Sequence, residues 1–197
     1  MSGEQGHDQP DAHHHHEPLD YGAAILAFRE DKDDYFRTGA GSPLPAGDRA
    51  SFGGLPYFGV DEALVFEDLP LEPYVGDEPV SFQIPTSDGR LRPAERAGVL
   101  RFEVGGHACR LTGYRFENSG AGAIFVPFLD GTSATETYGA GRYLDIEPEA
   151  DGTYILDFNL AYHPSCVYDT RFSCPLTPPE NRLPVRIEAG ERLAAGA

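Results

Sequence analysis

The first regular hydrophobic pattern in the chain has the spacing of an α-helix. Its members recur at i, i+4, i+7 and i+14, and a lysine at i+11 can lay its stem along the same stripe: Tyr21, Ile25, Phe28, Tyr35 and Lys32. Asp20 is a suitable N-cap and Gly39 a suitable C-terminal stop. The pattern predicts one amphipathic helix within residues 18–39 that packs on a sheet through this stripe.

From Tyr57 onward the hydrophobic period changes to two, which is typical of half-buried strands. Alternating apolar positions occur at Val80, Phe82 and Ile84 and again at Leu100, Phe102 and Val104. Gly105-Gly106 is a two-residue turn signal that fixes the register as Val104 with His107, Phe102 with Cys109 and Leu100 with Leu111. This register places Cys109 on the core side as a small buried hydrophobe.

Two more turn signals predict further strands. Asp130-Gly131 separates residues 124–129 from 132–138, which we expect to form a hairpin, and Asp151-Gly152 precedes a strand at 153–158. Residues 185–188 are expected to form the last short strand. Pro127 within its run indicates a sheet edge or a bulge.

These elements predict an all-β fold, an antiparallel β-sandwich or partly closed β-barrel with one N-terminal α-helix. The 23 Gly and 17 Pro suit many short strands and turns, and 40% hydrophobic residues suffice for a core. We expect a β domain over residues 40–197. Residues 1–17 carry almost no large apolar side chain and are expected to form a disordered arm. Its His13–His16 run could hold a divalent ion only weakly, so we interpret it as an idle tail.

The charge balance limits the kinds of partner that we expect the protein to bind. Lys+Arg 15 against Asp+Glu 32 gives a formal net charge of −17, and Lys32 is the only lysine. The acidic excess is spread along the chain, a pattern that resembles proteins of salt-loving archaea. Nucleic acid and anionic membranes are excluded as partners because their recognition depends on clustered Lys and Arg. We see neither an apolar signal core nor a membrane-spanning run, which predicts a cytoplasmic protein.

Three stretches together resemble domain-of-unknown-function family 1684. They are Phe128-Leu129-Asp130-Gly131-Thr132-Ser133 continuing through Glu136 to Leu144, then residues 156–162, and finally Cys174-Pro175-Leu176-Thr177-Pro178-Pro179-Glu180-Asn181-Arg182-Leu183. The resemblance covers about residues 50–192. It implies a shared fold and a shared site location, but supplies no reaction. At the position before the proline, similar members have asparagine, whereas this chain has His163.

One candidate site lies in residues 130–145, where polar and aromatic side chains are dense. Its members are Asp130, Glu136, Tyr138, Arg142, Tyr143 and Asp145. The Gly139-Ala140-Gly141 break allows a bend that aims several side chains at one point. Arg142 could clamp a carboxylate or phosphate in a bidentate way. Alternatively, Arg142 pairs with Glu136 or Asp145 and holds a corner of the sheet together.

A second candidate set follows the strand that ends at Phe158. It combines donors, acceptors and thiols in a proline-rich loop: Asn159, Tyr162, His163, Ser165, Cys166, Cys174, Asn181 and Arg182. Cys166 and Cys174 could form a disulfide that a cytoplasmic location disfavours, or hold a metal, although their spacing matches no standard zinc knuckle. Cys166 with His163 has the residue types of a thiol nucleophile and its base. The plainest interpretation is that both cysteines pack under the proline-rich loop.

These sets predict a module that binds a small polar or anionic ligand in a pocket at one end of the sheet. We expect the pocket where the 138–143 bend meets the 159–174 loop, and no cofactor can be named from the sequence. One alternative is a hydrolase or transferase that uses Cys166 or the Asp130 and Glu136 carboxylates. Another is a structural or partner-binding protein. The predicted binding residues are Asp130, Glu136, Tyr138, Arg142, Tyr143, Asn159, Tyr162, Cys166, Cys174, Asn181 and Arg182.

Overall fold

A computed structural model describes residues 20–194, so the predicted arm and its His13–His16 run lie outside the described residues. The elements are α1 Tyr21–Thr38, β1 Val65–Leu69, β2 Ser81–Pro85, β3 Leu91–Val104, β4 His107–Arg115, β5 Ile124–Phe128, β6 Arg142–Ile146 and β7 Tyr154–Asp157. Short 3-10 turns add Arg49–Ser51, Glu62–Leu64, Phe158–Leu160, Ser165–Val167 and Pro179–Asn181.

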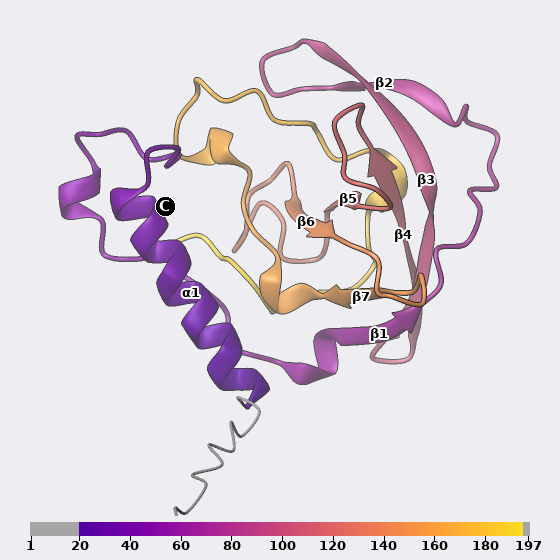
Figure 1. Cartoon of the computed structure of the whole chain (residues 1–197), viewed down its shortest axis with the longest axis horizontal. Coiled ribbons are helices and arrows are strands. Elements are labelled where there is room, and N and C mark those ends of the chain that lie inside the picture. The colour runs from indigo at the N-terminus through magenta and orange to yellow at the C-terminus, as the bar shows by residue number, and fades with distance from the viewer. Residues whose placement is uncertain (1–19, 195–197) are drawn as a thin grey trace, which may run out of the picture.

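The strands form two antiparallel sheets, and α1 lies to one side of them (Figure 1). The larger sheet has the order β2-β3-β4-β5-β6, and the smaller sheet pairs β1 with β7. The prediction of an all-β fold with one N-terminal helix is confirmed. Of its two forms, the two sheets fit the sandwich and not a closed barrel. No helix of the described residues combines the length and the apolar character that a bilayer crossing needs.

The core lies between the two sheets. Its fully buried side chains come from β3 to β5, from β7 with the turn that follows it, and from the C-terminal segment: Leu100, Leu111, Val126, Phe128, Leu156, Phe158, Ile187 and Ala189. The Phe158 ring contacts Phe128 at 5.1 Å and Phe102 at 5.6 Å between ring centroids. Aromatic packing therefore closes the smaller sheet onto the larger one.

The β3–β4 hairpin has the predicted register. Val104 pairs with His107, Phe102 with Cys109 and Leu100 with Leu111. Gly105 and Gly106 adopt φ values of +55° and +80°, as a two-residue hairpin turn requires. Cys109 is buried on the core face, as predicted.

A bulge between Arg96 and Gly98 shifts this register by one residue farther from the turn. Gly98 is pressed against the chain that precedes β2, because a Cβ there would lie 2.6 Å from the Glu72 carbonyl oxygen. Beyond the bulge Glu95 pairs with Arg115, and every side chain changes face relative to the unshifted register.

The hairpin predicted at Asp130-Gly131 is wrong. β5 pairs with β6, and residues 130–137 curl into a tight loop because the Thr132 amide and hydroxyl both donate to the Asp130 carboxylate. Residues 185–188 are likewise no strand. Their polar backbone groups bind this loop, with Gly131 N–H donating to Val185 at 2.8 Å and Ile187 N–H donating to Asp130 at 2.7 Å. The turn at Asp151-Gly152 does precede a strand, β7.

Pro127 is not at a sheet edge, since β5 lies between β4 and β6. Proline has no N–H to give to a neighbouring strand. The side chain of Asn181 fills the resulting gap: its amide nitrogen donates to Pro127 O at 2.7 Å and to Thr112 O at 2.8 Å, and its oxygen accepts from Thr112 N at 2.8 Å.

The predicted stripe of α1 is only partly right. Ile25 is buried, but Phe28 and Tyr35 are 43% and 48% exposed, and the buried face is completed by Arg29 and Phe36. A stripe defined by apolar residue types alone misses a buried arginine, whose Nη1 donates to the Phe58 carbonyl at 3.0 Å. The helix ends at the predicted residue, with Gly39 N–H donating to Tyr35 O, whereas Asp20 makes no side-chain capping bond.

Candidate functional site

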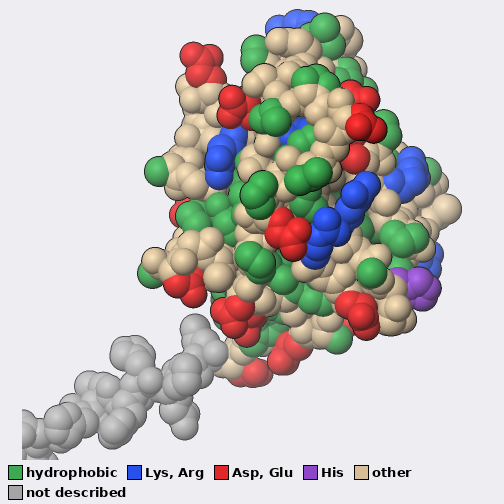
Figure 2. Space-filling model, turned by 90° about the vertical axis from the view of Figure 1, so that its right-hand side faces the viewer, with side chains coloured by type: hydrophobic (Ala, Val, Ile, Leu, Met, Phe, Trp, Pro, Cys, Tyr) green, Lys and Arg blue, Asp and Glu red, His purple; other side chains and the backbone are tan. Residues whose placement is uncertain are grey.

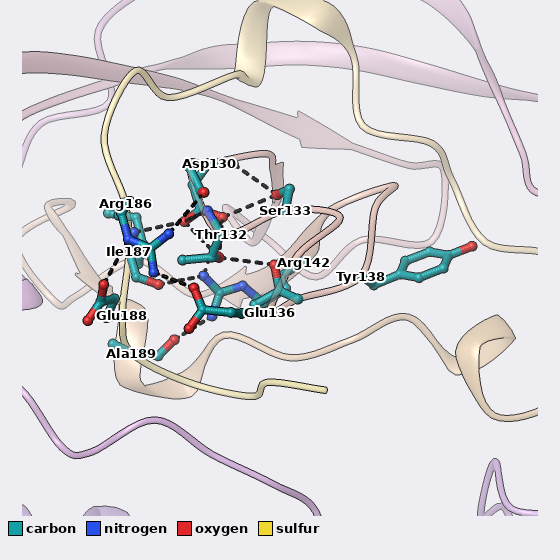
Figure 3. Close-up of polar contacts among 12 residues, drawn as sticks. Asp130, Thr132, Ser133, Glu136, Tyr138, Arg142, Arg186, Ile187, Glu188 and Ala189 are labelled. Atoms are coloured by element: carbon teal, nitrogen blue, oxygen red, sulfur yellow. Dashed lines mark hydrogen bonds and ion pairs between the residues drawn. The ribbon is translucent and has the colours of Figure 1, made fainter. Parts of the chain in front are cut away.

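Arg142 lies in a closed polar network at the C-terminal segment (Figure 3). Its side chain is buried, and its terminal nitrogens donate to the carbonyls of Ala189, Glu191 and Ile187. An Asp130 carboxylate oxygen lies 3.5 Å from Nη2. Burial lowers the pKa of Arg142, and the charge of Asp130 opposes this shift. The guanidinium therefore fastens residues 187–191 to the sheet and presents no free edge to a ligand.

The structural interpretation of Arg142 fits this network, but its partner is neither of the expected acids. Asp130 is the partner, while Glu136 pairs with Arg186 at the surface and Asp145 accepts a hydrogen bond from Tyr162. Tyr138 points away from the network in Figure 3. The residues of the first predicted set therefore do not form one site: Asp130 and Arg142 belong to the buried network, whereas Tyr138 lies away from it.

Asn159 and Asn181 are buried and act as backbone connectors. The Asn159 amide exchanges two hydrogen bonds of 2.8 Å with the Asp61 backbone and also donates to the Tyr21 hydroxyl. Asn181 bridges β4 and β5 as described above. Arg182 is exposed beside it. These three predicted binding residues do not share a cavity.

The other predicted residues do come together in one aromatic and thiol cluster. Its members are Tyr138, Tyr143, Tyr162, Cys166 and Cys174. Tyr143 packs edge to face on Phe125 at 4.7 Å and on Tyr162 at 5.7 Å between centroids. The Tyr162 hydroxyl donates to Asp145 at 2.5 Å. Burial is the main cause that raises the pKa of the Tyr143 and Tyr162 phenols, so both remain protonated donors.

A cavity of about 590 Å³ opens beside this cluster. We call it the aromatic pocket and define it by Arg92, Phe116, Phe125, Tyr143, Tyr162 and Cys174. Ser119, Asp145, Glu147 and Ser165 add polar groups to its lining. The carbon of the Arg92 guanidinium lies 4.0 Å from the centroid of the Phe116 ring, a cation–π contact.

Arg92 is the residue that sequence reasoning missed. Extending the register Glu95–Arg115 by one pair sets Phe116 opposite Ala94, and Arg92 is then the next residue on the same face. Without the bulge at Gly98, the register set by Gly105-Gly106 would place Arg92 and Phe116 on opposite faces. A bulge predicted at Gly98 would have placed Arg92 and Phe116 on the same face.

His163 is buried and already engaged. Its Nε2 accepts from the Tyr138 N–H at 3.2 Å, and its Nδ1 lies 3.7 Å from a Glu191 carboxylate oxygen. Burial, with smaller effects of Arg142 and Lys32, lowers the pKa of His163 to about 3, so the ring is neutral. The histidine is therefore committed to Tyr138 and Glu191 and does not serve Cys166 as a base.

Glu191 links this histidine to α1. One carboxylate oxygen lies 2.7 Å from Lys32 Nζ, and the other accepts from the His163 N–H at 2.7 Å and the Tyr168 hydroxyl at 3.1 Å. The Lys32 ammonium also lies 4.7 Å from the centroid of the Tyr162 ring. These contacts dock the helix beside the aromatic pocket.

Two further hollows adjoin the pocket. An acidic groove of about 730 Å³ is lined by carboxylates that include Glu62, Glu67 and Glu149, and a groove of about 580 Å³ runs between α1 and Tyr162. Within residues 20–194, no cluster of three or more His, Cys, Asp or Glu side chains is placed to hold a metal ion.

Comparisons with known proteins give a family and a neighbouring structure. The family model "Protein of unknown function (DUF1684)" matches residues 50–192. The solution NMR structure of an uncharacterised protein of Haloarcula marismortui is similar, with a TM-score of 0.64, 35% identity, and coverage of 88% of this chain and 95% of that chain. No curated protein matches the chain.

Proposed function

Because the chain belongs to the DUF1684 family of proteins of unknown function, we propose a function from the site itself. The protein binds a small polar ligand that carries an anionic group, and the aromatic pocket is the binding site. A volume of about 590 Å³ is within the range of small-molecule sites.

The observation that carries this proposal is the state of Arg92. Among residues 20–194 the Arg92 side chain has no hydrogen-bonding or ion-pairing partner, and its guanidinium lies over the Phe116 ring at 4.0 Å. Arg96, Arg101, Arg171 and Arg186 each pair with a carboxylate, whereas Arg110, Arg182 and Arg192 share with Arg92 the absence of such a partner among the described residues. What distinguishes Arg92 is that it lines the aromatic pocket. A guanidinium that lies over an aromatic ring without a hydrogen-bonding partner keeps its N–H groups available for a carboxylate or phosphate.

The opposite side of the pocket suits the rest of such a ligand. Asp145 and Glu147 are acceptors for hydroxyl or amine groups, and the T-shaped pair of Tyr143 and Tyr162 adds aromatic surface to the lining. The ligand would therefore be anionic at the Arg92 end and rich in donors at the Asp145 end. The face seen from the β3 side mixes basic, acidic and apolar side chains and is not a field of one sign (Figure 2). Recognition by an isolated arginine fits a small molecule better than a polyanion.

The test is binding of two named probes, inorganic phosphate and 4-hydroxybenzoate, followed by NMR chemical shifts at constant salt. We expect 4-hydroxybenzoate to shift the resonances of pocket residues, and Arg92→Ala to weaken its affinity about tenfold, equivalent to about 1.4 kcal/mol. Arg110→Ala is the matched control, since Arg110 is an exposed arginine of β4 near the Gly105-Gly106 turn. Equal affinities of the two variants for both probes would reject the pocket.

The enzymatic alternatives find no specific support in the site. Asp130 is committed to the loop and to Ile187, Glu136 is paired with Arg186, and His163 is committed to Tyr138. We further propose that the protein works in a salt-rich cytoplasm, which the net charge of −17 supports.

A further inference from the structure

Cys166 and Cys174 meet across the loop that separates them. The backbone N–H of Cys166 donates to the sulfur of Cys174 at 3.3 Å. Both side chains also belong to one apolar cluster, in which Cys174 is buried and Cys166 packs against it. A contact from one cysteine's backbone to the other's sulfur brings the two thiols within reach of each other.

Both cysteines are anchored independently of each other. Cys174 exchanges two hydrogen bonds with Ser87 in the β2–β3 turn, one from its N–H at 3.1 Å and one to its carbonyl at 2.8 Å. Cys166 belongs to the 3-10 turn Ser165–Val167, in which the Tyr168 N–H donates to Ser165 O. The approach of the two sulfurs is therefore set by the folded framework and not by a chance position of the loop.

The two thiols differ in exposure, which gives each a different part in oxidation. Cys166 is half-buried and meets a dissolved oxidant first, while Cys174 is buried. Burial raises the pKa of Cys174 to about 11, so this sulfur remains a thiol near neutral pH. All three cysteines are free in the structure, and Cys109 lies apart from the pair in the core of β4.

We propose that Cys166 and Cys174 are a reversible oxidation site that closes into a disulfide. With hydrogen peroxide as oxidant, the Cys166 thiolate attacks one peroxide oxygen, forming a sulfenic acid and releasing hydroxide. The Cys174 sulfur then displaces that oxygen as water, so two thiols and one peroxide give one disulfide and two waters. A dithiol reductant reverses the reaction.

The disulfide would join the Ser165–Val167 turn to the β2–β3 turn through Cys174 and Ser87. Cys174 also lines the aromatic pocket, so oxidation would alter one wall of that cavity. The oxidation site stands on the cysteine geometry alone and does not depend on the pocket having a ligand.

Peptide mapping tests the proposal directly, because trypsin separates the three cysteines. Cleavage after Arg101, Arg110, Arg142, Arg171 and Arg182 places Cys109 in residues 102–110, Cys166 in 143–171 and Cys174 in 172–182. The full chain, reduced and then treated with dilute peroxide while folded, should yield peptides 143–171 and 172–182 joined, with a mass lower by two hydrogens than the sum. Dithiothreitol should separate them.

Three variants keep the result interpretable. Cys109→Ala should form the same link, while Cys166→Ser and Cys174→Ser should abolish it without changing the circular dichroism spectrum. A sample unfolded in urea should link the two peptides more slowly than the folded protein. Oxidation of Cys166 to sulfinic acid without a link, a link that includes Cys109, or equal rates in folded and unfolded samples would each overturn the proposal.

Discussion

The side chain of Asn181 stands beside Thr112 as a strand residue would. Its oxygen accepts the Thr112 N–H and its nitrogen donates to the Thr112 carbonyl, each at 2.8 Å. The same nitrogen also donates to Pro127 O, and Thr112 O is the acceptor that Pro127, which has no N–H, cannot serve. One carboxamide thus completes the ladder between β4 and β5.

Replacing Asn181 by alanine should lower the free energy of unfolding by about 3 kcal/mol, because buried backbone groups lose their partners. Thermal unfolding at constant salt measures the loss. Arg182→Ala, at an exposed neighbour, should change stability by less than about 0.5 kcal/mol. Similar values for the two variants would show that Asn181 does not support the ladder.

Removing the charge of Arg142 should be among the most damaging substitutions. Arg142→Met leaves the buried Asp130 carboxylate without its cation, which costs about 3 to 5 kcal/mol. Adding Asp130→Asn should recover part of this loss, so a double-mutant cycle over the four proteins measures the coupling. Arg186→Met removes two exposed ion pairs and one long, exposed hydrogen bond to Gly131 O, and should cost less than about 1 kcal/mol. Additive effects of the first two substitutions would contradict the buried pair.

His163 should make stability depend on pH between its two pKa values. Its folded pKa of about 3 lies below the ordinary 6.5, so the unfolded chain binds the proton more tightly. The stabilisation is complete above pH 6.5 and is lost as pH falls toward 3, with a slope of at most about 1.4 kcal/mol per pH unit.

Denaturant unfolding between pH 7 and pH 5 checks this prediction, because most carboxylates remain ionised there. His163→Asn should flatten the curve over this range, whereas His107→Asn, at an exposed histidine, should leave it unchanged. A His163→Asn curve parallel to that of the parent protein would mean that this histidine is not the group responsible.

Gly141 combines a positive φ of +105° with close neighbours. A Cβ there would lie 2.5 Å from the Phe128 carbonyl oxygen and would also meet the Thr177 hydroxyl. Gly152 has a φ of +86° with nothing within 4 Å, so Gly152→Ala measures the backbone cost alone, about 1 kcal/mol. Gly141→Ala should cost at least about 2 kcal/mol more, and equal melting temperatures would refute the close packing of the bend.

Salt should stabilise the protein through screening of its charge of −17. Raising KCl from 0.1 M to 1 M shortens the Debye length from about 10 Å to about 3 Å, so the melting temperature should rise. KBr at the same ionic strengths should give the same rise below about 0.5 M if screening is the cause. A melting temperature that does not move with KCl would argue against adaptation to high salt.

Local signals predicted the parts of the fold whose partners are close in sequence. Gly105-Gly106 determined the register of β3 and β4 from the turn as far as Gly98, because a two-residue turn defines the pairs that follow it until a bulge intervenes. The hairpin predicted at Asp130-Gly131 was wrong because the Asp130 carboxylate accepts hydrogen bonds from the Thr132 and Ile187 N–H groups. These bonds hold the segment as a loop and not as a turn between two strands. The competing partner, Ile187, is distant in sequence and leaves no local pattern.

In the candidate site, too, contacts between residues distant in sequence could not be predicted from local patterns. Tyr143, Tyr162 and Cys174 were predicted in one site, and they do line one cavity, although their role in binding is still a prediction. Arg142 was considered for ligand binding because arginine suits anions, but it binds the Asp130 carboxylate and backbone carbonyls of residues 187–191, and those carbonyls have no sequence signal. Arg92 could not be foreseen, because a single bulge decides the face of the sheet on which it lies.

The ion pair between Lys32 and Glu191 also makes α1 chemically observable. Lys32 is the only lysine in the sequence, it is 18% exposed, and α1 precedes the residues that the family model matches. An amine-specific acylating reagent therefore modifies one side chain, which peptide mapping separates from the α-amine of the chain, and we expect that side chain to react slowly while the helix is docked. The rate of Lys32 acylation therefore measures how often this helix detaches from the sheets.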